Sequence, residues 1–164
     1  MRSSGALSEV LRANGRKVTP QRQSIFRALE GNDGHPSAEM VYDSVRKEME
    51  TISLKTVYQT LNDLAELGEI AALDLGTGAV RFDPNVERPH HHLVCRSCGK
   101  VRDVFVAFSG LELPAAHAHG YDVGSAEVVF RGTCAECRSA GRRSGPPSPP
   151  GARDEQSRNN HHHR

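Results

Sequence analysis

Two Cys-x-x-Cys pairs constrain the fold of this chain more than any other feature. All four of its cysteines fall in them, Cys95 with Cys98 and Cys134 with Cys137. Four thiolates at this spacing suit a tetrahedral Zn²⁺ ion, and a site closed by four sulfurs is structural rather than catalytic. A dithiol redox pair and two unrelated buried pairs are the alternatives. We favour a structural zinc that brings the second pair back to the first and closes a small domain.

The composition indicates a cytoplasmic protein with no membrane partner. The chain has 164 residues and a net charge of +1, enough length for one large domain or two small ones. No apolar run approaches the roughly 18 residues that a membrane span needs. The first residues show no signal-peptide pattern. In a reducing compartment, paired cysteines favour a metal clamp over disulfides.

Residues 1–82 carry the start and stop signals of several short helices. Thr19 followed by Pro20 is a helix start, and Ser37 and Ser53 are candidate caps of two more helices. Gly68 stands where a helix often ends in a left-handed residue. After it, "EIAALDL" and "AVRF" predict two strands joined by a glycine-rich turn. Helices followed by a hairpin predict a winged-helix DNA-binding domain over residues 1–82.

The helix expected after Ser53 has a polar face opposite its leucines. Side chains that donate to phosphates and base edges gather there: Lys55, Thr56, Tyr58, Gln59, Thr60 and Asn62. The segment 1–27 is basic, with Arg16 and Arg22 as its candidate DNA contacts. A plain solvated helix face is the alternative. We predict that Arg16, Arg22, Lys55, Thr56, Tyr58 and Gln59 contact double-stranded DNA.

The rest of the chain predicts a hinge, a small second domain and a tail. Residues 83–89 are rich in turn formers, and strands are expected in "HHLVC", "VRDVFVA" and "AEVVFRG", with a helical stretch near 110–119. The second domain, residues 90–140, is mixed α and β and needs a metal or a partner chain for stability. Residues 141–164 should be disordered, and the histidines at 161–163 are given no role. The whole chain is therefore expected to be α+β.

Histidines near the first cysteine pair predict a second metal site. Side chains alternate along a strand, so His90 and His92 share one face while His91 points away. With Asp83 and Asp103 they offer a mixed nitrogen and oxygen site suited to Fe²⁺, Mn²⁺, Zn²⁺ or Ni²⁺. The alternative is a solvated histidine run at a domain entrance.

Six motifs together resemble the ferric uptake regulator family of metal-dependent bacterial repressors. In order they are "VTPQRQSIF", "HPSAEMVYDSV", "ISLKTVYQTLNDLAELGEI", "RFDPN", "HHHLVCRSCGKVRDV" and "GTCAEC". The resemblance covers about residues 7–138. It implies a homodimer in which a winged helix precedes a dimerisation domain and binds palindromic operator DNA. It also implies a structural zinc on the four cysteines and a regulatory metal on His35, Asp83, His90, His92 and Asp103.

Within that family the chain is most similar to the peroxide-sensing branch. The ligand position in "RFDPN" is Asp83, where iron-uptake members tend to have glutamate. The resemblance implies that Fe²⁺ at the regulatory site reacts with hydrogen peroxide and oxidises a ligand histidine, matched by His35 and His90, so that DNA is released. Mn²⁺ would hold the repressor on DNA without this chemistry. Iron or other metal uptake control is the alternative.

Two other classes of protein compete with a repressor. A zinc enzyme would need an open coordination position and a nearby glutamate base, and no His-x-Glu precedes a cysteine pair here. We therefore expect no catalysis and no small-molecule substrate beyond metal ions and hydrogen peroxide. A metal storage or delivery protein would need the histidines but not the polar helix and the hairpin. His91, His117 and His119 have no assigned role.

Overall fold

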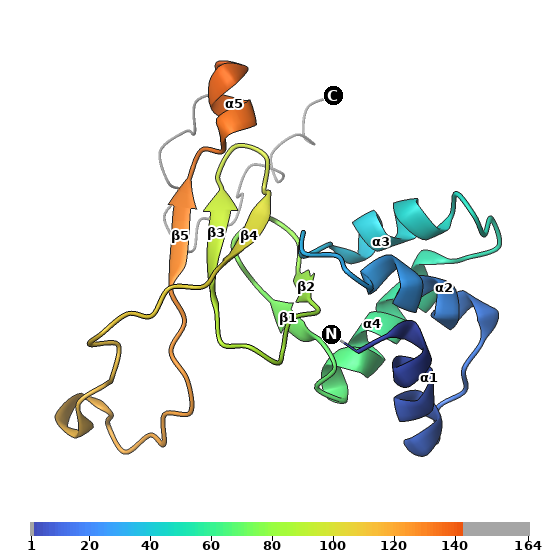
Figure 1. The fold of residues 1–164 in the computed structure, drawn as a ribbon, viewed down its shortest axis with the longest axis horizontal. Coiled ribbons are helices and arrows are strands. Elements are labelled where there is room, and N and C mark those ends of the chain that lie inside the picture. The colour runs from blue at the N-terminus through green and yellow to red at the C-terminus, as the bar shows by residue number, and fades with distance from the viewer. Residues whose placement is uncertain (1, 143–164) are drawn as a thin grey trace, which may run out of the picture.

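A computed structural model describes residues 2–142 and divides them into a helical part and a sheet-containing part (Figure 1). The helical part comes first in the chain and carries a small β-hairpin, while the three-stranded sheet lies beside it (Figure 1). The elements are α1 (Ser4–Ala13), α2 (Pro20–Leu29), α3 (Ala38–Val45), α4 (Leu54–Glu66), β1 (Ala71–Leu73), β2 (Arg81–Asp83), β3 (His91–Cys95), β4 (Val101–Val104), η1 (Ala115–His117), β5 (Val129–Gly132) and α5 (Ala135–Ser139).

The predicted helix starts are confirmed by hydrogen bonds. The hydroxyl oxygens of Thr19, Ser37 and Ser53 accept from backbone N–H groups at the first turns of α2, α3 and α4. These bonds satisfy donors that a helix cannot pair internally. Gly68 follows α4 with a φ of 71°, the left-handed conformation expected of it. Local capping chemistry therefore sets where three of the helices begin and where α4 ends.

The main core lies among the first four helices. Its fully buried members come from α1, α2, α3, α4 and the hairpin: Leu7, Leu11, Ile25, Phe26, Leu29, Val41, Val57, Leu61, Leu64, Ile70 and Phe82. One assignment on α4 is wrong. Thr60 was expected on the polar face, but its side chain is buried and its hydroxyl donates to the Thr56 carbonyl. A threonine hydroxyl satisfied by the preceding turn can be buried without an unpaired polar group.

The hairpin after α4 is antiparallel, with Ala71 opposite Asp83 and Leu73 opposite Arg81. The turn between its strands holds Gly76 and Gly78, both with positive φ. Helices α2, α3 and α4 packed together and followed by this hairpin form the winged helix expected from the sequence. The expected α+β fold class is therefore confirmed.

The second part is a three-stranded sheet of order β4-β3-β5. β3 pairs antiparallel with β4, so that His92 lies opposite Asp103, and parallel with β5, so that His92 also lies opposite Val129. The buried apolar core here consists of Leu75, Val94 and Val101, and Leu75 comes from the hairpin. So small a core needs help from another source of stability, and the four cysteines lie at one end of this sheet.

Between β4 and β5 the chain makes a long excursion away from the body of the molecule, seen at the lower left of Figure 1. A helical stretch was expected near residues 110–119, but only the three-residue 3₁₀ turn η1 forms. A helix in water needs an apolar face packed against something, and most apolar side chains of this excursion are exposed. They are Phe105, Val106, Phe108, Leu111, Leu113, Tyr121 and Val123.

Among the described residues, no helix is long and apolar enough to cross a membrane. The predicted disorder of residues 141–164 falls almost entirely outside the described residues, as do the histidines at 161–163.

Candidate metal centres

The four cysteines come together as the sequence predicts. Their sulfur atoms all lie within 4.8 Å of one another, and all four thiols are free. Cys95 ends β3 and Cys98 follows in the turn before β4, while the second pair brackets the start of α5. The hydrogen-bonded turn that closes on Gly99 folds the first pair back on itself. Four converging sulfurs at this separation fit a tetrahedral ion once they are deprotonated.

Backbone groups already favour a thiolate at this cluster. Burial raises the pKa of Cys95, but backbone N–H groups that point at its sulfur, first that of Cys134, bring the net pKa down to about 6. The Cys134 N–H lies 3.3 Å from the Cys95 sulfur. Hydrogen bonding to Cys134 raises the pKa of Cys137 to about 12, as expected when thiols share protons without an ion. A bound cation would remove those remaining protons.

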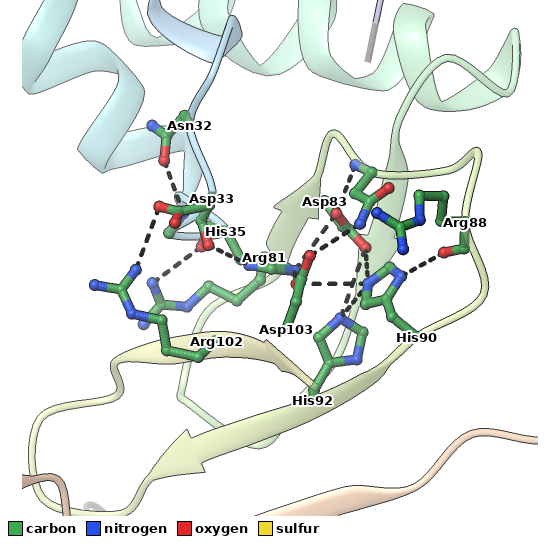
Figure 2. Close-up of polar contacts among 12 residues, drawn as sticks. Asn32, Asp33, His35, Arg81, Asp83, Arg88, His90, His92, Arg102 and Asp103 are labelled. Carbon is green, nitrogen blue, oxygen red and sulfur yellow. Dashed lines mark hydrogen bonds and ion pairs between the residues drawn. The ribbon is translucent and has the colours of Figure 1, made fainter. Parts of the chain in front are cut away.

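The predicted histidines and aspartates also converge, from four separate segments of the chain. His35 precedes α3 and Asp83 ends β2. His90 and His92 lie at the start of β3, and Asp103 lies on β4. The backbone N–H of Phe82 donates to the Pro36 carbonyl, which sets the His35 segment beside the end of β2. Figure 2 shows the side chains gathered around the Asp83 carboxylate.

The inward atoms of this histidine–aspartate cluster are three Nε2 nitrogens and two carboxylates. His90 Nε2 lies 2.8 Å from Asp83 Oδ2 and 3.1 Å from His92 Nε2. His35 Nε2 lies 2.9 Å from Asp103 Oδ1 and 3.4 Å from Asp83 Oδ1. His92 Nε2 lies 3.6 Å from Asp83 Oδ2. These separations are those of ligand atoms around a common centre rather than of one hydrogen-bonded pair.

Two buried polar atoms test whether an ion fits. Within the described residues, His35 Nε2 and Asp103 Oδ1 are buried and make no hydrogen bond of acceptable geometry, although they lie 2.9 Å apart. Leaving such atoms unsatisfied is costly, and a cation between them removes that cost. The group His35, His90, His92 and Asp103 presents ligand atoms that all lie within 4.8 Å of one another. The donor set of imidazole and carboxylate suits Fe²⁺, Mn²⁺ or Zn²⁺.

Each imidazole is oriented by an oxygen at its other nitrogen. His35 Nδ1 lies 3.1 Å from the Asp33 carbonyl oxygen, and His90 Nδ1 lies 2.8 Å from the Arg88 carbonyl oxygen. His92 Nδ1 contacts the Glu127 carboxylate. An oxygen at Nδ1 accepts a hydrogen bond from an N–H at that nitrogen and so keeps the proton there, which leaves the Nε2 lone pair free for an ion.

Protonated imidazole and ionised carboxylate balance each other's charge inside the cluster, and a bound cation could take the place of the imidazole protons. Burial raises the pKa of Asp83, but the neighbouring imidazoles of His35 and His92 and the backbone N–H of Asn85 outweigh it and hold that pKa well below its usual range. Burial lowers the pKa of His92, but the carboxylates of Asp83 and Glu127 outweigh it and raise that pKa above the usual value. A metal ion entering the site therefore displaces protons from imidazole.

Three residues that support the cluster were missed by the sequence reasoning. The backbone N–H of Asn85 donates to Asp83 Oδ1, and its side-chain amide donates to Asp103 Oδ2. The buried guanidinium of Arg81 donates to the His35 carbonyl and to the Gly99 carbonyl. Glu127 orients His92. Asn85 follows a ligand by two residues, the spacing of a side chain that caps a turn, and this was the available signal.

A cleft of about 760 Å³ adjoins the histidine–aspartate cluster. Its lining includes Asp83, His90, His92, Phe105 and Glu127. The cleft gives small solutes a way to the buried ligand atoms.

The candidate DNA-binding residues divide into two groups. Lys55 and Gln59 are exposed on α4 and Thr56 is half-buried beside them. Arg16 and Arg22 instead form ion pairs with Asp63 near the end of α4.

The Tyr58 hydroxyl donates to Glu39 Oε1 at 2.5 Å. DNA contact by the six residues Arg16, Arg22, Lys55, Thr56, Tyr58 and Gln59 stays a prediction.

Of the unassigned histidines, His91 packs on Phe108, while His117 and His119 are exposed.

Comparison with known proteins decides which family this arrangement represents. The model of the ferric uptake regulator family matches residues 13–131, most of the chain. The chain belongs to the ferric uptake regulator family. Members of this family are transcriptional regulators, so a regulator rather than an enzyme is confirmed.

Relatives of this chain include peroxide-responsive repressors. PerR of Staphylococcus epidermidis is 33% identical over 132 residues, which cover 80% of this chain and 87% of PerR. PerR of Staphylococcus aureus is 33% identical over 129 residues, which cover 78% of this chain and 86% of that protein.

Solved structures that are similar in fold include uptake regulators. A zinc-bound manganese uptake regulator aligns with a TM-score of 0.62 at 26% identity and covers 81% of this chain and 99% of its own. The ferric uptake regulator of Vibrio cholerae aligns with a TM-score of 0.64 at 27% identity and covers 78% of this chain and 99% of its own. The winged helix followed by a small sheet domain is thus the architecture of solved family members.

Proposed function

We propose that this family member is a metal-dependent repressor that binds operator DNA and releases it when hydrogen peroxide oxidises a ligand histidine. The observation that carries the proposal is the histidine–aspartate cluster, whose ligands come from both domains. His35 belongs to the DNA-binding domain, whereas His90, His92 and Asp103 belong to the sheet domain. An ion held by all of them favours the one domain arrangement in which they meet.

The proposed metals differ between the two clusters. Four sulfurs suit Zn²⁺ as a structural ion, while three imidazoles and two carboxylates suit Fe²⁺ or Mn²⁺ as the regulatory ion. Similar solved structures contain both kinds of metal, because they include a zinc-bound manganese uptake regulator and a ferric uptake regulator from Francisella tularensis with iron. The regulatory ligands are His35, Asp83, His90, His92 and Asp103.

The proposed DNA-binding form is a homodimer. The excursion between β4 and β5 and the outer face of the sheet carry exposed apolar side chains, including Phe105, Phe108 and Phe130. Apolar surface of this extent on a small domain marks a protein interface. The exposed residues of α4 would then meet the major groove, one α4 from each subunit, which suits a palindromic operator.

The proposed sensing step uses residues that the cleft already exposes to small solutes. A bound Fe²⁺ would supply the redox chemistry through which hydrogen peroxide oxidises a ligand histidine, whereas a bound Mn²⁺ would not. In the overall change one oxygen atom enters a C–H bond of the imidazole of His35 or His90, and the other leaves as water. An oxidised ring is a poorer ligand, so the domain arrangement that binds DNA loses its stabilisation.

A comparison of the two metals tests this proposal. Purified protein is loaded with Fe²⁺ or with Mn²⁺, exposed to dilute hydrogen peroxide, and assayed for binding to DNA selected from a random pool. We expect only the iron form to release DNA and to gain one oxygen on the peptide that holds His35 or His90, as read by mass spectrometry. If both forms keep their DNA and no histidine is modified, peroxide sensing is excluded.

Control of metal uptake is the second candidate function. It is favoured by the fold similarity to manganese and ferric uptake regulators. This function uses the same ligands and the same DNA contacts but needs no oxidation. In the experiment above, it predicts DNA binding that follows the metal concentration and is unaffected by peroxide in both forms.

A further inference from the structure

The oxygens that orient the three cluster histidines differ in kind. For His35 and His90 the acceptor is a backbone carbonyl two residues earlier in the chain. For His92 it is the carboxylate of Glu127, 35 residues away. A carbonyl two residues away stays close to its histidine whatever the position of the rest of the chain. The orientation of His92 depends instead on where a distant segment lies.

Backbone pairing explains why Glu127 reaches His92. Glu127 stands two residues before β5, and the His92 N–H donates to the Val128 carbonyl at 3.1 Å. The Val128 N–H in turn lies 3.2 Å from His91 Nδ1. These contacts hold the start of β5 against β3, so the Glu127 side chain projects beside the His92 ring. The arrangement requires the excursion between β4 and β5 to return to this point.

Glu127 acts on the side of the ring that the ligand atoms do not use. Its Oε1 contacts His92 Nδ1, whereas His92 Nε2 faces His90 Nε2 at 3.1 Å and Asp83. Glu127, like Asp83, is outside the set of residues whose ligand atoms all converge, but Asp83 faces the Nε2 atoms of His90 and His92, whereas Glu127 contacts Nδ1. A carboxylate behind an imidazole fixes the ring, keeps the proton on the near nitrogen and strengthens the far nitrogen as a donor.

We propose that Glu127 is a positioning residue for the regulatory metal, acting through His92. This inference rests on the ligand set of the proposed function and adds a residue from the third strand of the sheet. It ties metal affinity to the docking of β5, the strand that leads directly to the second cysteine pair. The regulatory site therefore reaches its full metal affinity only when β5 is paired with β3 in the sheet domain.

Metal affinity is the first test, because Glu127 can be changed without opening the core. Its side chain is 42% exposed. Binding of Mn²⁺ is measured by the electron paramagnetic resonance signal of the free ion, with zinc retained. We expect Glu127→Ala to weaken Mn²⁺ binding about 10- to 100-fold. Glu127→Gln, whose amide oxygen still accepts from Nδ1–H, should lie between the wild type and Glu127→Ala.

Glu112→Ala is the matched control. Glu112 is an exposed carboxylate on the same excursion, so its removal changes the charge equally without touching His92. We expect wild-type affinity from this variant. An unchanged Mn²⁺ affinity in Glu127→Ala, or equal losses in Glu127→Ala and Glu112→Ala, would overturn the assignment of Glu127.

A second readout separates positioning from a structural role. In ¹⁵N-histidine protein with diamagnetic Zn²⁺ in this site, the Nδ1–H proton of His92 should be protected from solvent exchange in the wild type and in Glu127→Gln. It should exchange rapidly in Glu127→Ala. The same exchange rate in all three proteins contradicts the inference. The ligand set of the proposed function has its own test: equal Mn²⁺ binding by wild-type protein and His90→Ala would show that His90 is not a ligand.

Discussion

The two metal centres differ in how much of the chain each one joins. The cysteine cluster is built from two short turns at one end of the sheet domain. The histidine–aspartate cluster is built from four segments that belong to both domains, and a buried arginine, Arg81, bridges the domains as well. An ion in the first cluster would join two segments of a single domain. An ion in the second cluster would change the balance between domain arrangements, so we propose that the second acts as the switch.

The largest effect should come from breaking the cysteine cluster. Cys98→Ser removes one of four ligands from a domain with a three-residue buried core. Structural zinc binding contributes about 10–16 kcal/mol in small zinc peptides, far more than this core can replace. We expect loss of zinc, unfolding of the sheet domain and loss of the dimer, measured by metal analysis and sedimentation. Ser97→Ala, one position away, should keep all three. A Cys98→Ser protein that keeps its zinc and its dimer contradicts a structural role.

The next largest effect should come from His92→Ala, which tests whether the two clusters are separate. Metal ions should strengthen operator binding by wild-type protein about 5- to 150-fold, the usual range of coupling between two sites. This variant should lose that increase while keeping its zinc and its fold. His117→Ala, an exposed histidine outside both clusters, should respond to metal as the wild type does. Loss of zinc in His92→Ala would show that the clusters are not independent.

Arg81→Ala tests the bridge between the domains. The guanidinium is buried and satisfies the His35 and Gly99 carbonyls at 3.3 Å and 2.9 Å. We expect a loss of about 1.5–3 kcal/mol in the free energy of unfolding, read from urea denaturation. Arg102→Ala breaks an exposed ion pair with Asp33 and should cost no more than about 1 kcal/mol. Equal losses of unfolding free energy in the two variants would show that Arg81 does not bridge the domains.

The smallest effect should come from Lys55→Ala on α4. A lysine that contacts a phosphate adds about one unit to the slope of log affinity against log salt. Removing it should lower that slope by about one and weaken DNA binding whichever metal is loaded. Lys47→Ala, an exposed lysine in the loop after α3, should leave the slope unchanged. A wild-type slope in Lys55→Ala would mean that α4 meets DNA with other residues.

Local signals predicted well wherever the cause of a structure is local. Thr19, Ser37 and Ser53 cap their helices because a hydroxyl reaches N–H groups within the same turn. The alternation of side chains along a strand predicted that His90 and His92 share a face, and His91 indeed points away and packs on Phe108. The cysteine spacing likewise predicted a cluster that the fold then assembles.

Features that depend on contacts between distant segments could not be predicted in this way. Periodicity placed Thr60 on a polar face, but burial in the helical core decided its position. His35 was expected only from the family resemblance, because nothing in its neighbours indicates a ligand. Arg81 and Glu127 meet the cluster through β2 and β5, and their partners lie up to 46 residues away. A helical stretch was expected near residues 110–119, but the apolar side chains of the excursion are exposed and only the short turn η1 forms there.

Selective removal of one metal from the wild-type protein would show which of the two clusters controls DNA binding. The protein is treated with a chelator of intermediate strength, and zinc content and operator binding are followed together as Mn²⁺ is removed and then restored. We expect one zinc ion per chain to stay bound throughout, while DNA binding is lost and regained with Mn²⁺. If DNA binding instead falls and returns with the zinc content, the histidine–aspartate cluster is not the switch.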